Sequence, residues 1–331
     1  MNKKPVAEVM EILSSKGKWL VLMHEKADGD TTGCAVAIAS LGTRLGRDVT
    51  LAGPDPFPSR YSFLLGGMPY CQIDVVPEKF FGDDCVVICV DTSNAERSIK
   101  GLSAARSKVL IVNIDHHDDN SKYGDVNWID GSSSATGEMV TELMSSSEWG
   151  ITPQEANSLY TAIVTDNGHF SFPSSTAKSH ERAVELLEAG ASPGMMAEEL
   201  ESNMTEGALK LWSRAFSRVA LFAGGLCAFF WLTKLDFEET LSTRQDTENL
   251  VNFLLRIRGV RLAALCTELG DGVRVSLRAR FPLSAHEIAV SLGGGGHNLA
   301  SGCTIREPLD DALKILRTEM ERHAETSFSA G

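Results

Sequence analysis

Carboxylate and imidazole side chains stand close behind several short apolar runs of this chain. These side chains belong to His24, Asp28, Asp30, Asp91, Asp115, His116, His117 and Asp166. Carboxylate oxygens and imidazole nitrogens together form a ligand set that suits divalent metal ions. Several carboxylates at one site also repel one another strongly unless cations neutralise them. If the fold brings these residues together, their types predict a site for divalent metal.

The apolar runs are predicted to be strands of a parallel sheet, because they are unbroken and rich in β-branched residues. They cover residues 19–23, 49–52, 85–90, 109–114 and 160–165. Helices are expected at residues 33–45, 135–144, from 153 towards 165, and 177–189. This alternation is typical of βαβ units, in which the carboxyl ends of the strands form one rim where ligands bind. The rim is therefore where we expect the carboxylates and imidazoles to meet.

Each of these residues also has a plain structural explanation, since an aspartate behind a strand is often the N-cap of a helix. The metal interpretation depends on the coincidence of all of them at one rim. Asp28 and Asp30 are two residues apart, so both can face the rim if their loop stays extended. Gly29 between them is expected to give the backbone the freedom to turn there.

The pattern changes after about residue 190, and the chain is long enough for two domains. We predict an α/β catalytic domain at residues 1–190, a helical linker at 191–218 and a smaller α/β domain at 219–331. The linker is predicted because Ser192-Pro193 is a helix-start signal and few β-forming residues follow it.

The smaller domain is expected to mix hairpins with helices. One hairpin is predicted around Gly224-Gly225 and a second around Asp271-Gly272. Helices are expected at residues 245–258, 284–292 and 309–323. Strands that flank such turns, with helices after them, favour a second α/β layer.

The formal net charge of −13 falls almost entirely upstream of Phe216. An acidic N-terminal part argues against a long polyanion tracking over its surface. It suits a site that concentrates cations, although solubility alone could explain it. The charge therefore disfavours proteins that hold extended nucleic acid.

Composition also predicts a cytoplasmic protein without a membrane segment. The N-terminus lacks the apolar core of a signal peptide, and the most apolar stretch, 219–233, is too short to cross a bilayer. The seven cysteines are scattered without a CxxC pair, which predicts buried, reduced thiols. Zinc-finger and disulfide-scaffold classes are excluded by this spacing.

Four segments resemble, in order, the motifs of the DHH phosphoesterase superfamily. They read HEKADGD-TTG, VVICVDTSNAERS, VNIDHH and YTAIVTDNGHF. Farther on, SLRAR and GGGGHNLASGC resemble the DHH-associated domain of the nanoRNase/pAp-phosphatase branch of that superfamily. The resemblance spans nearly the whole chain, and the set of motifs is specific where any one would be weak. It implies an α/β fold with a parallel-sheet DHH domain, a smaller α/β DHH-associated domain and a cleft between them.

The resemblance implies two divalent metal ions. His24, Asp28 and Asp91 would hold one ion, and the other would be held by Asp30, Asp91, His116 and Asp166. Asp91 would then bridge the pair. Imidazole ligands on an acidic rim favour manganese, with magnesium or cobalt as alternatives.

Two further residues of the DHH triplet are expected to serve catalysis. We hypothesise that both ions activate a shared water, which attacks phosphorus in line with the leaving oxygen. Asp115 would support an imidazole from behind. His117 would lie next to the substrate, as a phosphate contact or as the proton donor to the leaving group.

The second domain is expected to hold the substrate. Arg274, Arg278 and Arg280 are evenly spaced on a predicted strand, so they share a face. By resemblance Arg278 would contact a phosphate or a base. The successive N–H groups of Gly294, Gly295 and Gly296 could point together at an anion, and His297 would add a hydrogen-bond donor. The alternative is that this run is only a glycine-rich turn.

Four residues depart from the usual family pattern, the first being Ala27, which stands where proline is common. Cys34 is expected to be buried near a helix start. Asn167 and His169 are expected near the second metal, where they could tune substrate contacts, although His169 could simply pack at the rim.

The function predicted from these residues and the resemblance is a two-metal phosphoesterase. It would hydrolyse very short oligoribonucleotides to mononucleotides and 3'-phosphoadenosine 5'-phosphate (pAp) to AMP. A cyclic di-AMP or pApA phosphodiesterase is the alternative that is hardest to separate. A RecJ-like single-strand exonuclease, a family II pyrophosphatase and a non-catalytic nucleotide-binding module fit the residues less well. Family members often form homodimers, and no membrane partner is expected.

Overall fold

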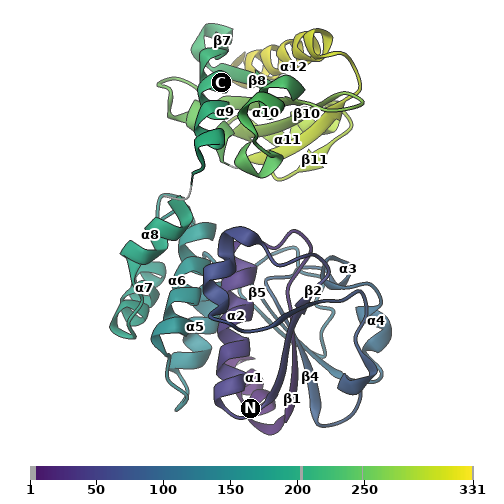
Figure 1. Cartoon of the computed structure of the whole chain (residues 1–331), viewed down its shortest axis with the longest axis vertical. Helices are drawn as coiled ribbons and strands as arrows, with labels where there is room; N and C mark the ends of the chain where they lie inside the picture. The colour runs from purple at the N-terminus through teal and green to yellow at the C-terminus, as the bar shows by residue number, and fades with distance from the viewer. Residues whose placement is uncertain (1–4, 202–203, 248, 330–331) are drawn as a thin grey trace. The chain divides into compact units, whose positions relative to one another are not determined.

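The computed structural model describes residues 5–201, 204–247 and 249–329, which form two compact units. The first unit is Met1–Asn203 and the second is Met204–Gly331. Each unit has its own six-stranded sheet and its own hydrophobic core (Figure 1). The segment predicted as a helical linker contains α8 (Pro193–Glu201) and α9 (Glu206–Ser217), one in each unit.

The sheet of the first unit is fully parallel, with strand order β3-β2-β1-β4-β5-β6. Its strands are β1 (Lys18–Leu22), β2 (Asp48–Gly53), β3 (Tyr70–Gln72), β4 (Cys85–Val90), β5 (Leu110–Asp115) and β6 (Val126–Ile129). The predicted strands that became β1, β2, β4 and β5 are confirmed. The two edge strands β3 and β6 were not predicted. They are short and only partly buried, so they lack the apolar runs that mark the others.

Helices cover both faces of this sheet, which explains why its central strands are apolar throughout. One face packs on α1 (Pro5–Ser15), α2 (Gly29–Arg44), α5 (Thr136–Ser145) and α6 (Pro153–Asp166) (Figure 1). The other face packs on α3 (Ala95–Ser98), α4 (Leu102–Ala105) and the short 3-10 turn η2 (Glu78–Phe80). Side chains of β1 alternate between the two cores, with Val21 on the first face and Leu22 on the second.

The strand predicted at residues 160–165 is wrong, because these residues form the C-terminal half of α6. Thr152 and Glu155 form a capping box at its start, and a proline occupies the first helical turn. Leu159, Ala162 and Ile163 are all fully buried, and this i, i+3, i+4 spacing is that of one helix face. Asp166 therefore reaches the rim from the end of a helix.

Small residues let α2 pack closely against α6. A Cβ atom added at Gly33 would lie 2.2 Å from the carbonyl oxygen of Ser158, and one at Gly29 would lie 2.2 Å from Oγ1 of Thr165. The extended loop predicted around Gly29 is wrong, because Gly29 is already the first residue of α2. Close approach to α6 is therefore the reason for a glycine at this position.

The second unit contains a mixed sheet with strand order β11-β12-β10-β9-β8-β7. Its strands are β7 (Ala220–Phe222), β8 (Cys227–Leu232), β9 (Leu262–Glu268), β10 (Val273–Ala279), β11 (Gly295–Gly296) and β12 (Ala300–Ile305). The two predicted hairpins are confirmed as the antiparallel pairs β7–β8 and β9–β10. Only β8 and β9 are parallel. The glycine run and the residues after it form β11 and β12, which were not predicted.

Helices lie on both faces of the second sheet. One core contains residues of α11 (Ala285–Ser291) and α12 (Leu309–Ser329), and the other contains residues of α9 and the 3-10 segment η5 (Leu250–Arg256). A further helix, α10 (Lys234–Thr240), follows β8. The helices predicted at residues 284–292 and 309–323 are confirmed. The helix predicted at 245–258 is wrong in type, because its residues form the 3-10 segments η4 (Arg244–Thr247) and η5.

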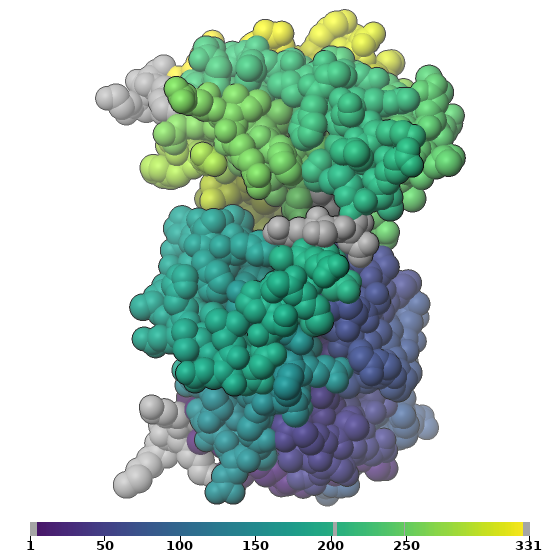
Figure 2. All heavy atoms as spheres, turned by 60° about the vertical axis from the view of Figure 1, so that its left-hand side comes forward, coloured from purple at the N-terminus to yellow at the C-terminus, as the bar shows by residue number. Residues whose placement is uncertain are grey.

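The surface of the first unit includes α7 (Ala177–Glu188) and α8, whose teal residues Figure 2 shows on the outside. No helix within the described ranges is long and apolar enough to cross a membrane. All seven cysteines are free thiols, and six of them are buried. Cys71 is exposed, which corrects the prediction that all are buried.

Replacing Gly33 with alanine should test whether the close packing of α2 on α6 is essential. The added methyl group has no room beside the Ser158 carbonyl, so we expect the free energy of unfolding to fall by about 1–3 kcal/mol in urea denaturation. Gly194→Ala in α8 is the matched control, because a Cβ atom there meets no atom within 4 Å. That control should be neutral or up to about 1 kcal/mol more stable. Equal effects of the two variants would contradict this packing.

Candidate metal centre

The site lies at the carboxyl ends of β1 and β4, the two central strands of the first sheet. Strand order reverses between them, since β2 and β3 extend to one side while β5 and β6 extend to the other. Such a switch point leaves a crevice above the strand ends. His24 lies just after β1 and Asp91 just after β4, so the ends of these two strands place both residues at the crevice.

Asp91 is the central residue of the site. It has a φ of 53°, in the left-handed region that non-glycine residues rarely adopt, and its side chain is only 2% exposed. Its N–H group donates to the carbonyl oxygen of Ile114 on the neighbouring strand. The strained conformation is thus held by the sheet, and strain of this kind is often found at functional sites.

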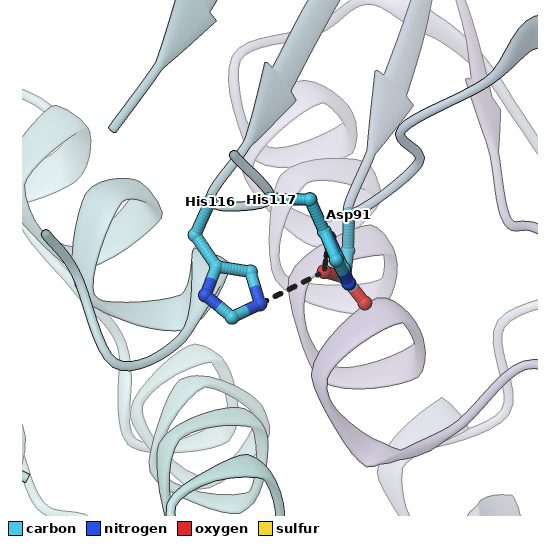
Figure 3. Close-up of side chains that lie close together, drawn as sticks. All are labelled: Asp91, His116 and His117. Atoms are coloured by element: carbon cyan, nitrogen blue, oxygen red, sulfur yellow. Dashed lines mark ion pairs between the residues drawn. The ribbon is translucent and has the colours of Figure 1, made fainter. Parts of the chain in front are cut away.

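The two oxygens of Asp91 face different groups of donors. Oδ2 lies 3.7 Å from Nε2 of His24, and Oδ1 lies 3.6 Å from Nε2 of His116. Oδ1 is also 3.6 Å from Nδ1 of His117 (Figure 3). Two threonine hydroxyls fix the carboxylate, since Thr31 donates to Oδ2 at 2.6 Å and Thr136 donates to Oδ1 at 3.1 Å.

The first donor group consists of His24, Asp28 and Asp91, whose ligand atoms lie within 4.8 Å of one another. Asp28 is the N-cap of α2 and accepts a hydrogen bond from the N–H of Thr31. Nε2 of His24 lies 3.9 Å from Oδ1 of Asp28, and its Nδ1 is 2.7 Å from the carbonyl oxygen of Glu25. The Nδ1 contact orients the ring so that Nε2 faces the two carboxylates.

The second donor group consists of Asp30, His116 and Asp166, again within 4.8 Å of one another. Nε2 of His116 lies 3.4 Å from Oδ2 of Asp166 and 3.8 Å from Oδ2 of Asp30. Nδ1 of His116 is 3.2 Å from the carbonyl oxygen of Ser133, which turns Nε2 towards the carboxylates. Together with Oδ1 of Asp91, this group offers three carboxylates and one imidazole.

Asp30 belongs to the first turn of α2, and its carboxylate reaches the N-terminus of α5, where free N–H groups favour an anion. Its Oδ2 accepts from the N–H of Thr136 at 2.6 Å, and its Oδ1 accepts from the N–H of Gly137 at 2.9 Å. The thiol of Cys34, one turn along α2, donates to Oδ1 at 3.4 Å. Cys34 is buried as predicted, and burial holds its pKa well above the usual value, so it remains a thiol. These contacts fix the orientation of the carboxylate.

Asp115 is a nearer partner of His117 than Asp91, whose Oδ1 lies 3.6 Å from Nδ1 of the ring. Nδ1 of His117 lies 2.8 Å from Oδ1 of Asp115, and this hydrogen bond raises the pKa of His117 to about 9. Oδ2 of Asp115, which is fully buried, accepts from Nδ2 of Asn120 at 2.5 Å. The same amide donates to Oδ1 of Asn113, so a chain of buried polar groups supports the imidazole.

Burial and mutual charge set the pKa values of the carboxylates. Burial, followed by the charge of Asp91, holds the pKa of Asp30 well above its usual range. Burial likewise raises the pKa of Asp166 to about 7. Burial would raise the pKa of Asp91 too, but its hydrogen bond to His24 and the nearby imidazoles lower it to about 2. Asp91 therefore stays ionised, and its two neighbours resist ionisation next to it.

This donor set fits divalent metal ions. Four carboxylates and two imidazoles converge here. Burial is the main cause of the raised pKa of Asp30, and repulsion from the neighbouring carboxylates, which cations would remove, adds to it. Oxygen and imidazole donors of this kind suit manganese and related ions, whereas no thiolate is offered. Asp91 also forms a third candidate group with His116 and His117, whose ligand atoms again lie within 4.8 Å of one another, so the residues present could hold metal on both sides of the Asp91 carboxylate.

The residues predicted to bind substrate lie in the second unit. Arg274 and Arg278 share one face of β10, as predicted, and Arg280 follows the strand. Burial lowers the pKa of the Arg278 guanidinium. The N–H groups of Gly294 and His297 already donate to Ala289 and Ala300, so neither is free to bind an anion. Gly295 and Gly296 form β11, and the side chain of His297 is exposed.

Several supporting residues were missed by the sequence analysis. They are Thr31, Ser133, Thr136, Gly137, Asn113 and Asn120. A signal was present for Asn113, a polar residue inside an otherwise apolar strand. Asn167 is also buried, and its Oδ1 accepts from the N–H of Phe170, so it holds the turn behind Asp166.

Comparison with known proteins gives the same picture over both units. Residues 18–163 match the DHH family, N-terminal domain, and residues 234–322 match the DHHA1 domain. A protein of Bacillus subtilis named "Bifunctional oligoribonuclease and PAP phosphatase NrnA" is 30% identical, over 93% of this chain and 96% of that protein. A Thermus thermophilus protein of the same name is 28% identical, over 96% of this chain and 94% of that protein.

A solved structure, that of an exopolyphosphatase-related protein from Bacteroides fragilis, shares the fold and aligns with a TM-score of 0.89 at 21% identity. The alignment covers 98% of this chain and 97% of that one.

Asp91→Asn should weaken metal binding at both donor groups, because the side chain would lose the charge that both groups share. We expect the affinity for Mn²⁺ in isothermal titration calorimetry to fall by about 100-fold or more, beyond what changes behind a ligand usually cause. Asp119→Asn is the matched control, since Asp119 is exposed and outside both groups. Undiminished Mn²⁺ binding by the Asp91 variant would contradict the assignment.

Proposed function

Because this chain belongs to the DHH family, we propose that it is a two-metal phosphoesterase that cleaves very short oligoribonucleotides to mononucleotides and converts pAp to AMP. The observation that carries the proposal is the carboxylate of Asp91, with one oxygen turned to His24 and the other to His116. Since each of these histidines belongs to a different cluster of candidate ligands, Asp91 is the residue that two ions would share.

Names of relatives support the substrate class. The Bacillus subtilis and Thermus thermophilus proteins are both named for oligoribonuclease and PAP phosphatase activity, and each aligns with this chain over nearly its full length. Both activities hydrolyse a phosphate ester bond of a ribonucleotide, a diester in one case and a monoester in the other. One site that cleaves phosphate esters can therefore serve both.

His24, Asp28 and Asp91 would hold one divalent ion, and Asp30, Asp91, His116 and Asp166 would hold the second. When bound, a pair of such ions lowers the pKa of water and neutralises charge on the phosphate. We propose manganese, because imidazole and carboxylate donors occur together.

His117 is proposed to act on the substrate rather than to bind metal. Asp115 engages Nδ1 of its ring, so Nε2 remains available for a proton transfer or a phosphate contact. The chain of Asp115 and Asn120 keeps the ring in one orientation. His117 would thereby donate a proton to the oxygen that leaves phosphorus.

Arg278 and His297 are proposed to contact a phosphate or base of the substrate, and Gly294, Gly295 and Gly296 to leave space next to them. A guanidinium binds phosphate through paired hydrogen bonds, and burial around Arg278 strengthens such contacts. The absence of bulky side chains in the glycine run would let a nucleotide approach the backbone. We also propose that the protein acts in the cytoplasm, where its seven thiols would stay reduced.

A side-by-side comparison of substrates with Mn²⁺ tests the proposal. We expect pApA, short oligoribonucleotides and pAp to be hydrolysed at least about tenfold faster than long RNA or cyclic di-AMP. Product formation would be followed by chromatography, with the Asp91→Asn protein as the control for contaminating nucleases. Cyclic di-AMP as the best substrate would favour the phosphodiesterase alternative, and equal rates on long RNA would contradict a short-substrate enzyme.

Asn120→Ala should lower turnover without loss of metal, because it removes the amide that fixes Asp115 behind His117. We expect kcat on pApA to fall by roughly tenfold or more, with Mn²⁺ affinity unchanged. The loss should be smaller on bis-p-nitrophenyl phosphate, whose leaving group needs little protonation. Asn127→Ala is the control, since its amide bonds only to Gly124. Equal losses on both substrates would exclude a role in proton donation.

A further inference from the structure

A fully buried glutamate lies in the first turn of α5, behind the metal centre. This residue, Glu138, is 0% exposed. Its Oε1 accepts from the hydroxyl of Ser134 at 2.5 Å and from the N–H of the same residue at 3.3 Å. Within the described residues, its Oε2 is buried and has no hydrogen-bond partner. Because a buried and partly unpaired carboxyl group costs free energy, its place at the start of a helix does not by itself explain this residue.

One peptide group connects Glu138 with a predicted metal ligand. The peptide bond between Ser133 and Ser134 directs its N–H to Oε1 of Glu138. The carbonyl oxygen of the same peptide, which belongs to Ser133, lies 3.2 Å from Nδ1 of His116. The other nitrogen of that ring, Nε2, faces Asp91 (Figure 3). A change in the orientation of this peptide would therefore turn the imidazole.

The hydroxyl of Ser134 is also connected to the end of α6. Nδ2 of Asn167 donates to it at 3.5 Å, and the hydroxyl of Ser179 donates to it at 3.1 Å. All three of these side chains are buried. Asn167 directly follows Asp166, which is the last residue of α6. Ser134 thus contacts the helix end that carries Asp166 and also belongs to the peptide behind His116.

The same helix start holds Asp30. The N–H groups of Thr136 and Gly137, which lie between Ser134 and Glu138 in the chain, donate to its Oδ2 at 2.6 Å and to its Oδ1 at 2.9 Å. The hydrogen bonds from Ser134 to Glu138 close a turn around these two residues. The turn therefore fixes the directions in which the two N–H groups point.

All three members of the second donor group consequently depend on this turn, whereas the first group has no such support. Within the described ranges, no hydrogen bond connects Ser134 or Glu138 to His24 or Asp28. We propose that Ser134 and Glu138 are positioning residues that set the affinity of the second donor group for a divalent ion and leave that of the first group unchanged. The inference rests on the proposed function, because it concerns one of the two ions of that enzyme.

Calorimetric titration of the full chain with Mn²⁺ in two backgrounds tests the proposal. Asp28→Asn weakens the first donor group, and Asp166→Asn weakens the second. Added to Asp28→Asn, Ser134→Ala should weaken the remaining Mn²⁺ site by roughly tenfold or more, as loss of a contact behind a metal ligand usually does. Added to Asp166→Asn, it should leave the remaining affinity unchanged. Ser40→Ala is the matched control, because the hydroxyl of Ser40 also donates to a buried glutamate in the first turn of a helix, Glu155 of α6.

Two substitutions of Glu138 separate positioning from stability. Glu138→Leu removes the acceptor but still fills much of the space, so it should weaken Mn²⁺ binding as Ser134→Ala does. Glu138→Gln keeps an oxygen that can accept both hydrogen bonds from Ser134, so its affinity should stay close to that of the background. A general loss of stability, measured in urea, would instead act on both backgrounds alike.

The outcomes that overturn the proposal are distinct from those that overturn the function. Equal weakening in both backgrounds, or an effect of Ser40→Ala as large as that of Ser134→Ala, would show a general role in stability. No weakening in either background would remove the proposal outright, and so would an Asp28→Asn protein that binds no Mn²⁺, since no separate second site would then exist. The expected selectivity in a protein that hydrolyses neither pAp nor pApA would leave the positioning role standing and contradict only the proposed function.

Discussion

The carboxylate of Asp91 lies buried where three other carboxylates and three imidazoles converge, and the rest of the site is arranged around that electrostatic conflict. Burial opposes the ionisation of Asp30, Asp91 and Asp166, and the negative charge of Asp91 further raises the pKa of the other two. Asp91 alone has its pKa lowered, because the imidazoles surround it. Bound divalent cations would relieve this repulsion. Without them, some of the carboxylates must be neutralised by protonation. The fixed positions of these acidic groups therefore favour the binding of cations.

The fold supplies the rigidity that such an arrangement needs. Strand order reverses between β1 and β4, which opens a crevice where His24 and Asp91 emerge. Helix α2 brings Asp28 and Asp30, and α6 brings Asp166, and glycines on α2 allow the two helices to approach closely enough. Hydrogen bonds from Thr31, Thr136 and Gly137 then fix the carboxylate oxygens.

The meeting of His24, Asp91 and His116 at one rim could be predicted from the sequence, because each follows an apolar run that forms a strand of the sheet. The errors arose where local patterns were ambiguous. Residues 160–165 are mostly apolar or β-branched, yet the capping box of Thr152 and Glu155 starts a helix that includes them. Residues such as Asn120 were missed because their roles depend on contacts between segments that no local spacing encodes. The glycine run was read as an anion-binding loop, but antiparallel pairing with β12 uses part of its backbone.

The most direct test of the central claim is the number and coupling of metal ions in the full chain. Titration with Mn²⁺ at neutral pH, followed by electron paramagnetic resonance, reports both. Two donor groups that share Asp91 predict two ions per chain with an exchange-coupled spectrum, since such pairs lie about 3.5–4 Å apart. A single bound ion, or two ions with the uncoupled six-line spectrum of isolated Mn²⁺, would contradict the account.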